Sequence, residues 1–106
     1  MAANDLFLQK GLPANLEIER YLLGAILVDP SAFLNVASLI QPTDFSVQSH
    51  QLIFTRMIEL SEANSHIDRV TLANELMRHG ELETVGGLSY LVSLDDGMPK
   101  LYDLER

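Results

Sequence analysis

The sequence predicts an all-α fold, a compact bundle of five to six short helices. Apolar residues recur at helical spacing in five separate segments, and no stretch alternates with period two over the length of a strand. The β-branched residues are scattered among helix-forming residues, which also argues against a sheet. The chain has 106 residues, of which 47% are hydrophobic, so it suits one small domain with a simple core.

The first two helices are predicted from their apolar stripes and from the residues that begin them. A helix is expected at residues 16–27, where Asn15 is a favourable N-cap and glutamates lie near the positive end of the helix dipole. A second helix is expected to begin with Asp29 as its N-cap and Pro30 at its first position. Its apolar residues follow the spacing i, i+3, i+4, i+7, and Pro42 ends it.

Three further helices are expected at residues 47–62, 69–79 and 87–94. The first of these has the widest apolar stripe, so it is the candidate for the central helix. Asp68 is a favourable N-cap for the next one, and Gly80 lies where a left-handed residue commonly ends a helix.

The helices define one domain at residues 12–95. Residues 1–11 are interpreted as a flexible N-terminal tail, because Gly11 and Pro13 mark the start of ordered structure. Residues 96–106 follow the last predicted helix and are interpreted as the start of a linker.

The chain is acidic, with 15 Asp and Glu residues against 7 Lys and Arg residues and a net charge of −8. Proteins that bind nucleic acids neutralise phosphates with Lys and Arg side chains, and here these residues are scattered singly. Strong direct binding to DNA is therefore disfavoured, and a protein partner with a basic surface is favoured.

The cellular setting is indicated by what the sequence lacks. The absence of cysteine excludes disulfides and thiolate metal sites, and it fits a reducing cytoplasm. Neither a signal peptide nor a membrane span is expected, because the N-terminus has no basic region followed by a long apolar run and the apolar stretches are short.

Residues 80–91, GELETVGGLSYL, form a glycine-rich segment ahead of a predicted helix, an arrangement that can hold phosphate. A phosphate loop has four residues between its glycines and then Lys and Ser or Thr. Here five residues separate Gly80 from Gly86, and Gly87 and Leu88 follow. The glycines are therefore predicted to allow positive φ or a tight approach where the last helix begins.

Residue spacing does not indicate a metal site or a catalytic site. The histidines form no HExxH-like pair and are expected as surface or capping residues: His50, His66 and His79. Three aspartates are explained as caps or turn residues: Asp29, Asp44 and Asp68. No hydroxyl side chain has an evident His–Asp arrangement, so no catalytic, metal or nucleotide site is predicted.

Partner binding is better supported by the sequence. Tyr21 lies beside the apolar stripe of the first helix, and Tyr90 and Leu94 form a second apolar face on the last helix. A helix with two apolar faces is either fully buried or carries an added interface, and the sequence leaves both open. Glu17 and Tyr90 could belong to one partner-facing surface, although the sequence alone does not bring them together.

Three stretches, taken together, resemble the N-terminal domain of bacterial replicative DNA helicases of the DnaB type. The opening of that domain is similar to LPANLEIERYLLGAILVDP, its central segment to QPTDFSVQSHQLIFTRMIEL, and its closing segment to IDRVTLANELMRHGELETVGGLSYL. The resemblance covers residues 12–95, in order and without large gaps. Ser46 departs from the family, which usually has tyrosine at that position.

The resemblance implies a non-catalytic interaction domain within the N-terminal collar of a hexameric ring. Its implied partners are primase, the other helicase subunits and a helicase loader. ATP, Mg²⁺ and strand translocation would belong to a separate motor domain, toward which residues 96–106 begin a linker, so no cofactor is expected in this chain. By motif position, the role in primase communication falls on Glu17, in LEIE, and on Tyr90, in VGGLSYL.

Two alternatives remain beside this interpretation. A small all-α enzyme would need an unrecognised pair of carboxylates with strongly raised pKa values in a cleft. A nucleic-acid-binding module would show tight single-strand binding that weakens steeply with salt.

Overall fold

The computed structural model describes residues 16–96. Five α-helices and two short 3₁₀-helices form within this range, which contains no strand, so the all-α prediction is confirmed. They are α2 (Leu16–Val28), η1 (Pro30–Ala32), α3 (Phe33–Ala37), η2 (Pro42–Asp44), α4 (Gln48–Glu62), α5 (Arg69–Arg78) and α6 (Gly87–Asp95). The predicted tail at residues 1–11, the predicted cap Asn15 and nearly all of the predicted linker at residues 96–106 lie outside the described residues.

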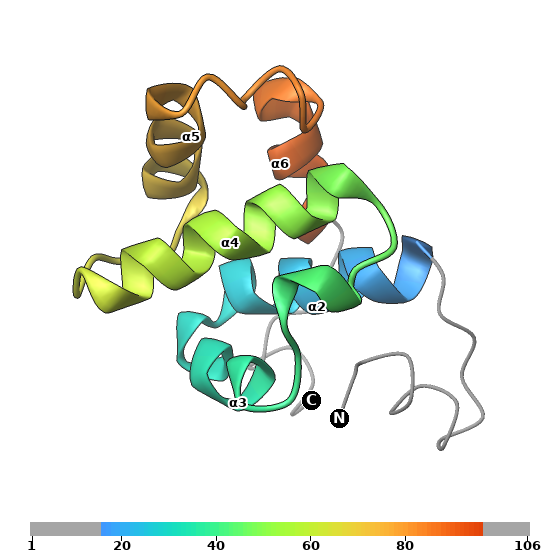
Figure 1. Ribbon diagram of the computed structural model, residues 1–106, viewed down its shortest axis with the longest axis vertical. Helices are drawn as coiled ribbons and strands as arrows, with labels where there is room; N and C mark the ends of the chain where they lie inside the picture. Colours follow the sequence, from blue (N-terminus) through green and yellow to red (C-terminus); the bar gives the residue numbers. More distant parts are fainter. Residues whose placement is uncertain (1–15, 97–106) are drawn as a thin grey trace.

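Helix α4 crosses the middle of the molecule (Figure 1) and packs against α2, α5 and η2. Its apolar stripe is buried, with Ile53, Phe54 and Met57 all 0% exposed, as expected of a central helix. The Phe54 ring lies 5.7 Å from the ring of Phe33 and 5.3 Å from the ring of Phe45. Full burial of a side chain of this size stabilises the fold by about 1.5–3 kcal/mol, so α4 anchors the core.

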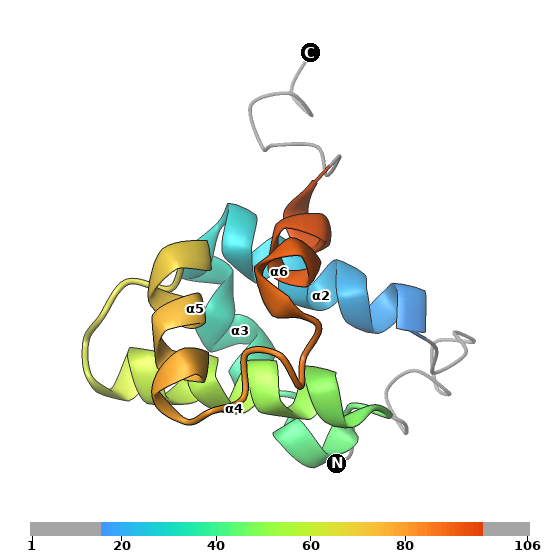
Figure 2. The same ribbon diagram turned by 90° about the horizontal axis from the view of Figure 1, so that it is seen from above.

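Helix α6 packs on α2, and Figure 2 shows the two helices crossing. Leu91 and Leu94 of α6 are buried in the core together with Leu23 of α2, whereas Leu88 is 53% exposed. Helix α6 is therefore only partly buried. Tyr90 packs against the edge of the core beside these buried leucines.

The predicted second helix, from Asp29 to Pro42, is wrong in its length. It is divided into η1 and α3, and it ends at Ala37. The Asp29 carboxylate accepts hydrogen bonds from the backbone N–H of Ser31 at 3.2 Å and from its hydroxyl at 2.6 Å, which favours a tight first turn. Proline disfavours helical backbone in the residue before it, and Gln41 is extended, with φ −109° and ψ 159°.

The other helices agree closely with the sequence. Helices α2, α4, α5 and α6 each differ from their predicted bounds by one residue at one end. The Asp68 cap is present, because its carboxylate accepts the backbone N–H of Thr71 at 2.8 Å. None of the described helices combines the length and the apolar character that a bilayer span requires.

The glycines of the segment before α6 have the backbone geometry that the sequence predicts. Gly80, Gly86 and Gly87 have φ values of +69°, +112° and +78°. Gly86 is also the N-cap residue of α6, and a Cβ added to it would lie 2.8 Å from the Cβ of Tyr90. Gly86 therefore allows the close approach of the backbone that places Tyr90.

Candidate partner-binding site on helices α2 and α6

A buried chain of hydrogen bonds joins α2, α4 and α6. Glu19 of α2 and His50 of α4 are each 1% exposed, and Glu19 Oε1 lies 2.7 Å from His50 Nδ1. The other ring nitrogen, His50 Nε2, lies 2.5 Å from the hydroxyl oxygen of Tyr90 on α6. The second Glu19 oxygen accepts the backbone N–H of Ser46 at 2.8 Å. A buried carboxylate is costly unless it is hydrogen-bonded, and Glu19 has a partner for each oxygen.

The Glu19 carboxylate fixes the position of one proton in this series of hydrogen bonds. An ionised carboxylate only accepts hydrogen bonds, so His50 Nδ1 carries a proton and donates it to Glu19. When the imidazole is neutral, Nε2 is left with a lone pair that accepts the hydroxyl proton of Tyr90. The Tyr90 side chain is thereby tied to the interior by its hydroxyl.

Tyr90 is neutral at pH 7 and also contacts an arginine. Burial raises the pKa of its hydroxyl above the ordinary value, Arg20 opposes this rise, and Glu19 adds to it. The rings of Tyr90 and His50 are stacked, with centroids 5.9 Å apart and an angle of 20° between the planes. The guanidinium carbon of Arg20 lies 5.5 Å from the centroid of the Tyr90 ring, within the range of a cation–π interaction.

Arg20 is exposed and forms part of a shallow hollow between α2 and the end of α6. The hollow has a volume of about 430 Å³ and is lined by Glu17, Arg20, Tyr21, Ser93, Leu94 and Asp96. Arg20 Nη2 donates a hydrogen bond to Ser93 Oγ at 3.4 Å, and the Ser93 hydroxyl donates to the backbone oxygen of Tyr90 at 2.6 Å. Two carboxylates, Glu17 and Asp96, therefore share this surface with one guanidinium.

The two residues predicted as partner-binding lie near this hollow but in different positions. Glu17 lines it, whereas Tyr90 is not among its lining residues. Tyr90 lies next to the hollow and contacts Arg20, which does line it. The fold thus relates the two predicted residues through Arg20, a residue that the sequence did not indicate.

Glu19 and His50 were also missed, and His50 is not the surface or capping residue expected from the sequence. The pattern contains a signal for both. Glu19 lies at position i of a stripe whose other members, at i+3, i+4 and i+7, are apolar: Leu22, Leu23 and Ile26. His50 has the same relation to Ile53, Phe54 and Met57. A polar residue at such a position is expected to be buried and to need a partner.

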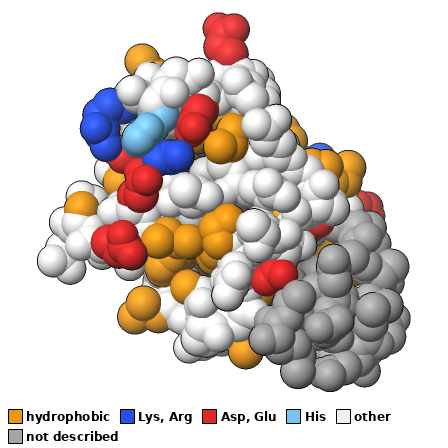
Figure 3. Space-filling view, in the orientation of Figure 1, with side chains coloured by type: hydrophobic (Ala, Val, Ile, Leu, Met, Phe, Trp, Pro, Cys, Tyr) orange, Lys and Arg blue, Asp and Glu red, His pale blue; other side chains and the backbone are white. Residues whose placement is uncertain are grey.

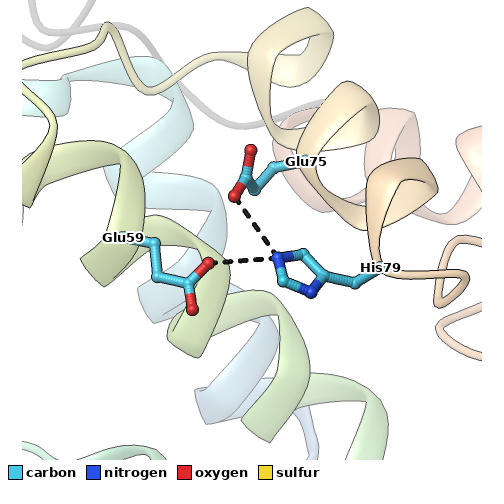
Figure 4. A group of neighbouring side chains, drawn as sticks. All are labelled: Glu59, Glu75 and His79. Atoms are coloured by element: carbon cyan, nitrogen blue, oxygen red, sulfur yellow. Dashed lines mark ion pairs between the residues drawn. The ribbon is translucent and has the colours of Figure 1, made fainter.

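A second group of ionisable side chains lies where α5 faces α4. On the face drawn in Figure 3, acidic, basic and histidine side chains gather in this area. Figure 4 shows Glu59 of α4 and Glu75 of α5 pointing toward the imidazole of His79, and His79 Nε2 lies 3.4 and 3.5 Å from their oxygens. This spacing would suit ligands of one metal ion.

Two guanidinium groups already occupy these ligand atoms. Arg56 Nη1 lies 2.6 Å from Glu59 Oε1 and 3.0 Å from His79 Nε2, and Arg78 Nη2 lies 2.6 Å from Glu75 Oε2. Arg56 is buried, and its Nε also pairs with Glu81 at 3.0 Å. A divalent ion would have to displace this guanidinium, so we interpret the group as an ion-pair network.

Adding Zn²⁺ is therefore expected to leave the melting temperature of the chain unchanged. An ion that bound only the native state would raise the melting temperature, and the rise would be larger for tighter binding. The measurement is thermal unfolding followed by circular dichroism, with and without Zn²⁺ and with EDTA as the control. A rise that disappears in the His79→Ala variant would show that the group does bind metal.

Comparison with known proteins agrees with the resemblance seen in the sequence. A family model described as "DnaB-like helicase N terminal domain" matches residues 11–106. The chain is 34% identical over 102 residues to the replicative DNA helicase DnaB of Geobacillus stearothermophilus and 37% identical over 101 residues to the replicative DNA helicase DnaC of Bacillus subtilis (strain 168). These alignments cover 96% and 95% of this chain, and the chain spans 22% of the length of each helicase.

A solved structure shows the same fold. It is the crystal structure of the N-terminal domain of DnaB helicase from Mycobacterium tuberculosis, with a TM-score of 0.79 and 33% sequence identity. The match covers 83% of this chain and 61% of that one. The family match, the curated relatives and the shared helical fold together establish that this chain belongs to the DnaB-like helicase N-terminal domain family.

Proposed function

We propose that this chain is a non-catalytic protein-interaction domain of a replicative DNA helicase and that it binds primase through the hollow between α2 and α6. The membership of the family supports the helicase role. In this proposal the domain also contacts the other subunits in the collar of a hexameric ring and receives a helicase loader, all in the cytoplasm. ATP hydrolysis with Mg²⁺ belongs to a separate motor domain of the parent protein.

The observation that carries the primase proposal is the charge of the hollow. Glu17 and Asp96 place two carboxylates against the single guanidinium of Arg20, and the whole chain has a net charge of −8. Such a surface attracts a basic protein surface and aligns it during encounter. The same charges would repel the phosphates of a nucleic acid, which disfavours the nucleic-acid-binding alternative.

The two carboxyl groups whose pKa clearly departs from its ordinary range, Asp68 and Glu75, lend no support to the enzyme alternative. A catalytic acid would need a strongly raised pKa. Among the described carboxyl groups, the pKa values that clearly depart from their ordinary range are lowered. A hydrogen bond from the Thr71 backbone lowers the pKa of Asp68, and hydrogen bonding to Arg78 lowers that of Glu75. Both groups are therefore ionised structural residues at neutral pH.

The Glu17→Lys variant tests the proposal. It is expected to weaken binding of the helicase-binding domain of the cognate primase by about tenfold or more, because like charges placed opposite each other cost several kcal/mol. Isothermal titration calorimetry measures the affinity. The matched control is Glu62→Lys, which makes the same charge change at the exposed end of α4 and is expected to bind as wild type does. Absence of wild-type binding, or equal binding by both variants, would contradict the proposal.

A further inference from the structure

We infer that Arg20 is a partner-contacting residue of the α2–α6 hollow and that Tyr90 is a positioning residue, held by His50 and Glu19, that fixes the Arg20 side chain. The inference rests on the proposed function, because it names the residues through which the same surface meets its partner. It goes beyond the role in primase communication that the resemblance implies for Tyr90, because it states how Tyr90 acts.

The position of Tyr90 is set from inside the fold. Its hydroxyl is bound to His50 Nε2, and His50 is in turn bound to the buried carboxylate of Glu19. Its backbone is set by Gly86, which allows an approach that a side chain at that position would block. Because its hydroxyl is used within the protein and Tyr90 does not line the hollow, the residue is better placed to support a neighbour than to meet a partner.

The supported neighbour is Arg20. A free arginine side chain loses rotamer entropy when it is fixed in a complex. Here the Tyr90 ring and the Ser93 hydroxyl already hold the guanidinium, at 5.5 and 3.4 Å. Fixing a contact residue in advance lowers the entropic cost of binding. Tyr90 thereby contributes to affinity without touching the partner.

The guanidinium of Arg20 keeps donors for a partner. A guanidinium has five N–H donors, and within residues 16–96 its one hydrogen bond is to Ser93 and no carboxylate forms an ion pair with it. Glu17 and Asp96 line the same hollow. The surface therefore fits a basic protein surface that presents one hydrogen-bond acceptor, a carboxylate or a main-chain carbonyl, opposite Arg20.

A double-mutant cycle on the 106-residue chain distinguishes positioning from direct contact. Affinity for the helicase-binding domain of the cognate primase is measured by calorimetry for wild type, Arg20→Ala, Tyr90→Leu and the double variant. Each single variant is expected to bind about tenfold more weakly, which is the loss typical of an interface residue that contributes measurably to affinity. The double variant is expected to bind within about twofold of Arg20→Ala, because Tyr90 acts through Arg20. Arg78→Ala, which removes a positive charge at the exposed end of α5, is the matched control and is expected to bind as wild type.

Independent losses, giving about a hundredfold weakening in the double variant, would overturn the positioning role and make Tyr90 a direct contact. Wild-type affinity in Arg20→Ala would overturn the contact role of Arg20. Both outcomes leave primase binding by the chain intact, whereas absence of wild-type binding overturns the proposed function and this inference together. Circular dichroism checks that each variant is folded, and Tyr90→Phe replaces Tyr90→Leu in the cycle if the latter is unfolded.

The free chain gives a second test. In nuclear magnetic resonance spectra, the side-chain protons of Arg20 are expected to carry an upfield ring-current shift from Tyr90. Tyr90→Phe keeps the ring but removes the hydroxyl that His50 holds. The shift is expected to fall in this variant, because the ring is less fixed. An unchanged shift in Tyr90→Phe would show that His50 and Glu19 do not position the ring.

Discussion

Replacing His50 with leucine is expected to lower the free energy of unfolding by about 3–5 kcal/mol, because it leaves a buried carboxylate without its hydrogen-bond donor. Glu19 and His50 are each 1% exposed and lie 2.7 Å apart, so water cannot take the place of the imidazole. A small domain is stable by about 5–15 kcal/mol, so this loss is a large part of the total. Urea unfolding at pH 7, followed by circular dichroism, measures it.

Two companion variants separate the effect of an unpaired Glu19 carboxylate from the effect of losing a histidine side chain. Replacing both members of a buried polar pair with apolar residues is often nearly neutral. The double variant Glu19→Leu/His50→Leu is therefore expected to recover part of the stability, although the N–H of Ser46 loses its acceptor. His66→Leu, at an exposed histidine, is expected to change little. A double variant no more stable than His50→Leu would contradict the view that the unpaired carboxylate causes the loss.

Replacing Gly86 with alanine is expected to lower the free energy of unfolding by about 2–4 kcal/mol, through backbone strain and overpacking together. Gly86 has φ +112°, which L-residues rarely adopt, and the new Cβ would lie 2.8 Å from Tyr90 Cβ. The Tyr90 backbone must shift to relieve this contact, so we also expect the Arg20 resonances to move. Urea unfolding and nuclear magnetic resonance spectra measure the two effects.

Gly80→Ala is the matched control for Gly86→Ala. Gly80 also has positive φ, at +69°, but no atom lies within 4 Å of the position of its missing Cβ. Its substitution is expected to cost only the left-handed strain, about 1–2 kcal/mol. It is also expected to leave the Arg20 resonances in place. Equal costs and equal spectral changes for the two variants would contradict the close packing of Gly86 on Tyr90.

Local patterns account for most of the fold. The apolar spacing of α4 and the cap at Asp68 act within one helix, so the sequence displays them directly. The second helix was predicted too long because its apolar spacing runs on to Ile40, which is indeed buried. The backbone leaves the helix before that point, and Pro42 disfavours helical geometry at Gln41, which is extended.

The candidate site could be predicted only in part, because its contacts join helices that are distant in sequence. Glu17 and Tyr90 came from the resemblance, and neither residue by itself indicates Arg20. Glu19 and His50 occupy positions of the apolar stripes of their helices, so the sequence pattern itself marks both residues as buried. Their pairing with each other, 31 residues apart, depends on how α2 packs on α4. The group of Glu59, Glu75 and His79 was missed for the same reason.

The protonation of the His50 imidazole, observed in ¹⁵N nuclear magnetic resonance spectra of the folded chain at pH 7, tests most directly whether the interior holds Tyr90. The hydrogen-bonded chain from Glu19 to Tyr90 requires a proton on Nδ1, because the Glu19 carboxylate is an acceptor there. We predict that Nδ1 is protonated in wild type and that the Nε2 resonance moves in Tyr90→Phe, which removes its partner. An imidazole that is protonated only at Nε2, and whose Nε2 resonance does not move in Tyr90→Phe, would contradict the hydrogen bonds from Glu19 through His50 to Tyr90. It would also contradict the positioning of Tyr90 that follows from them.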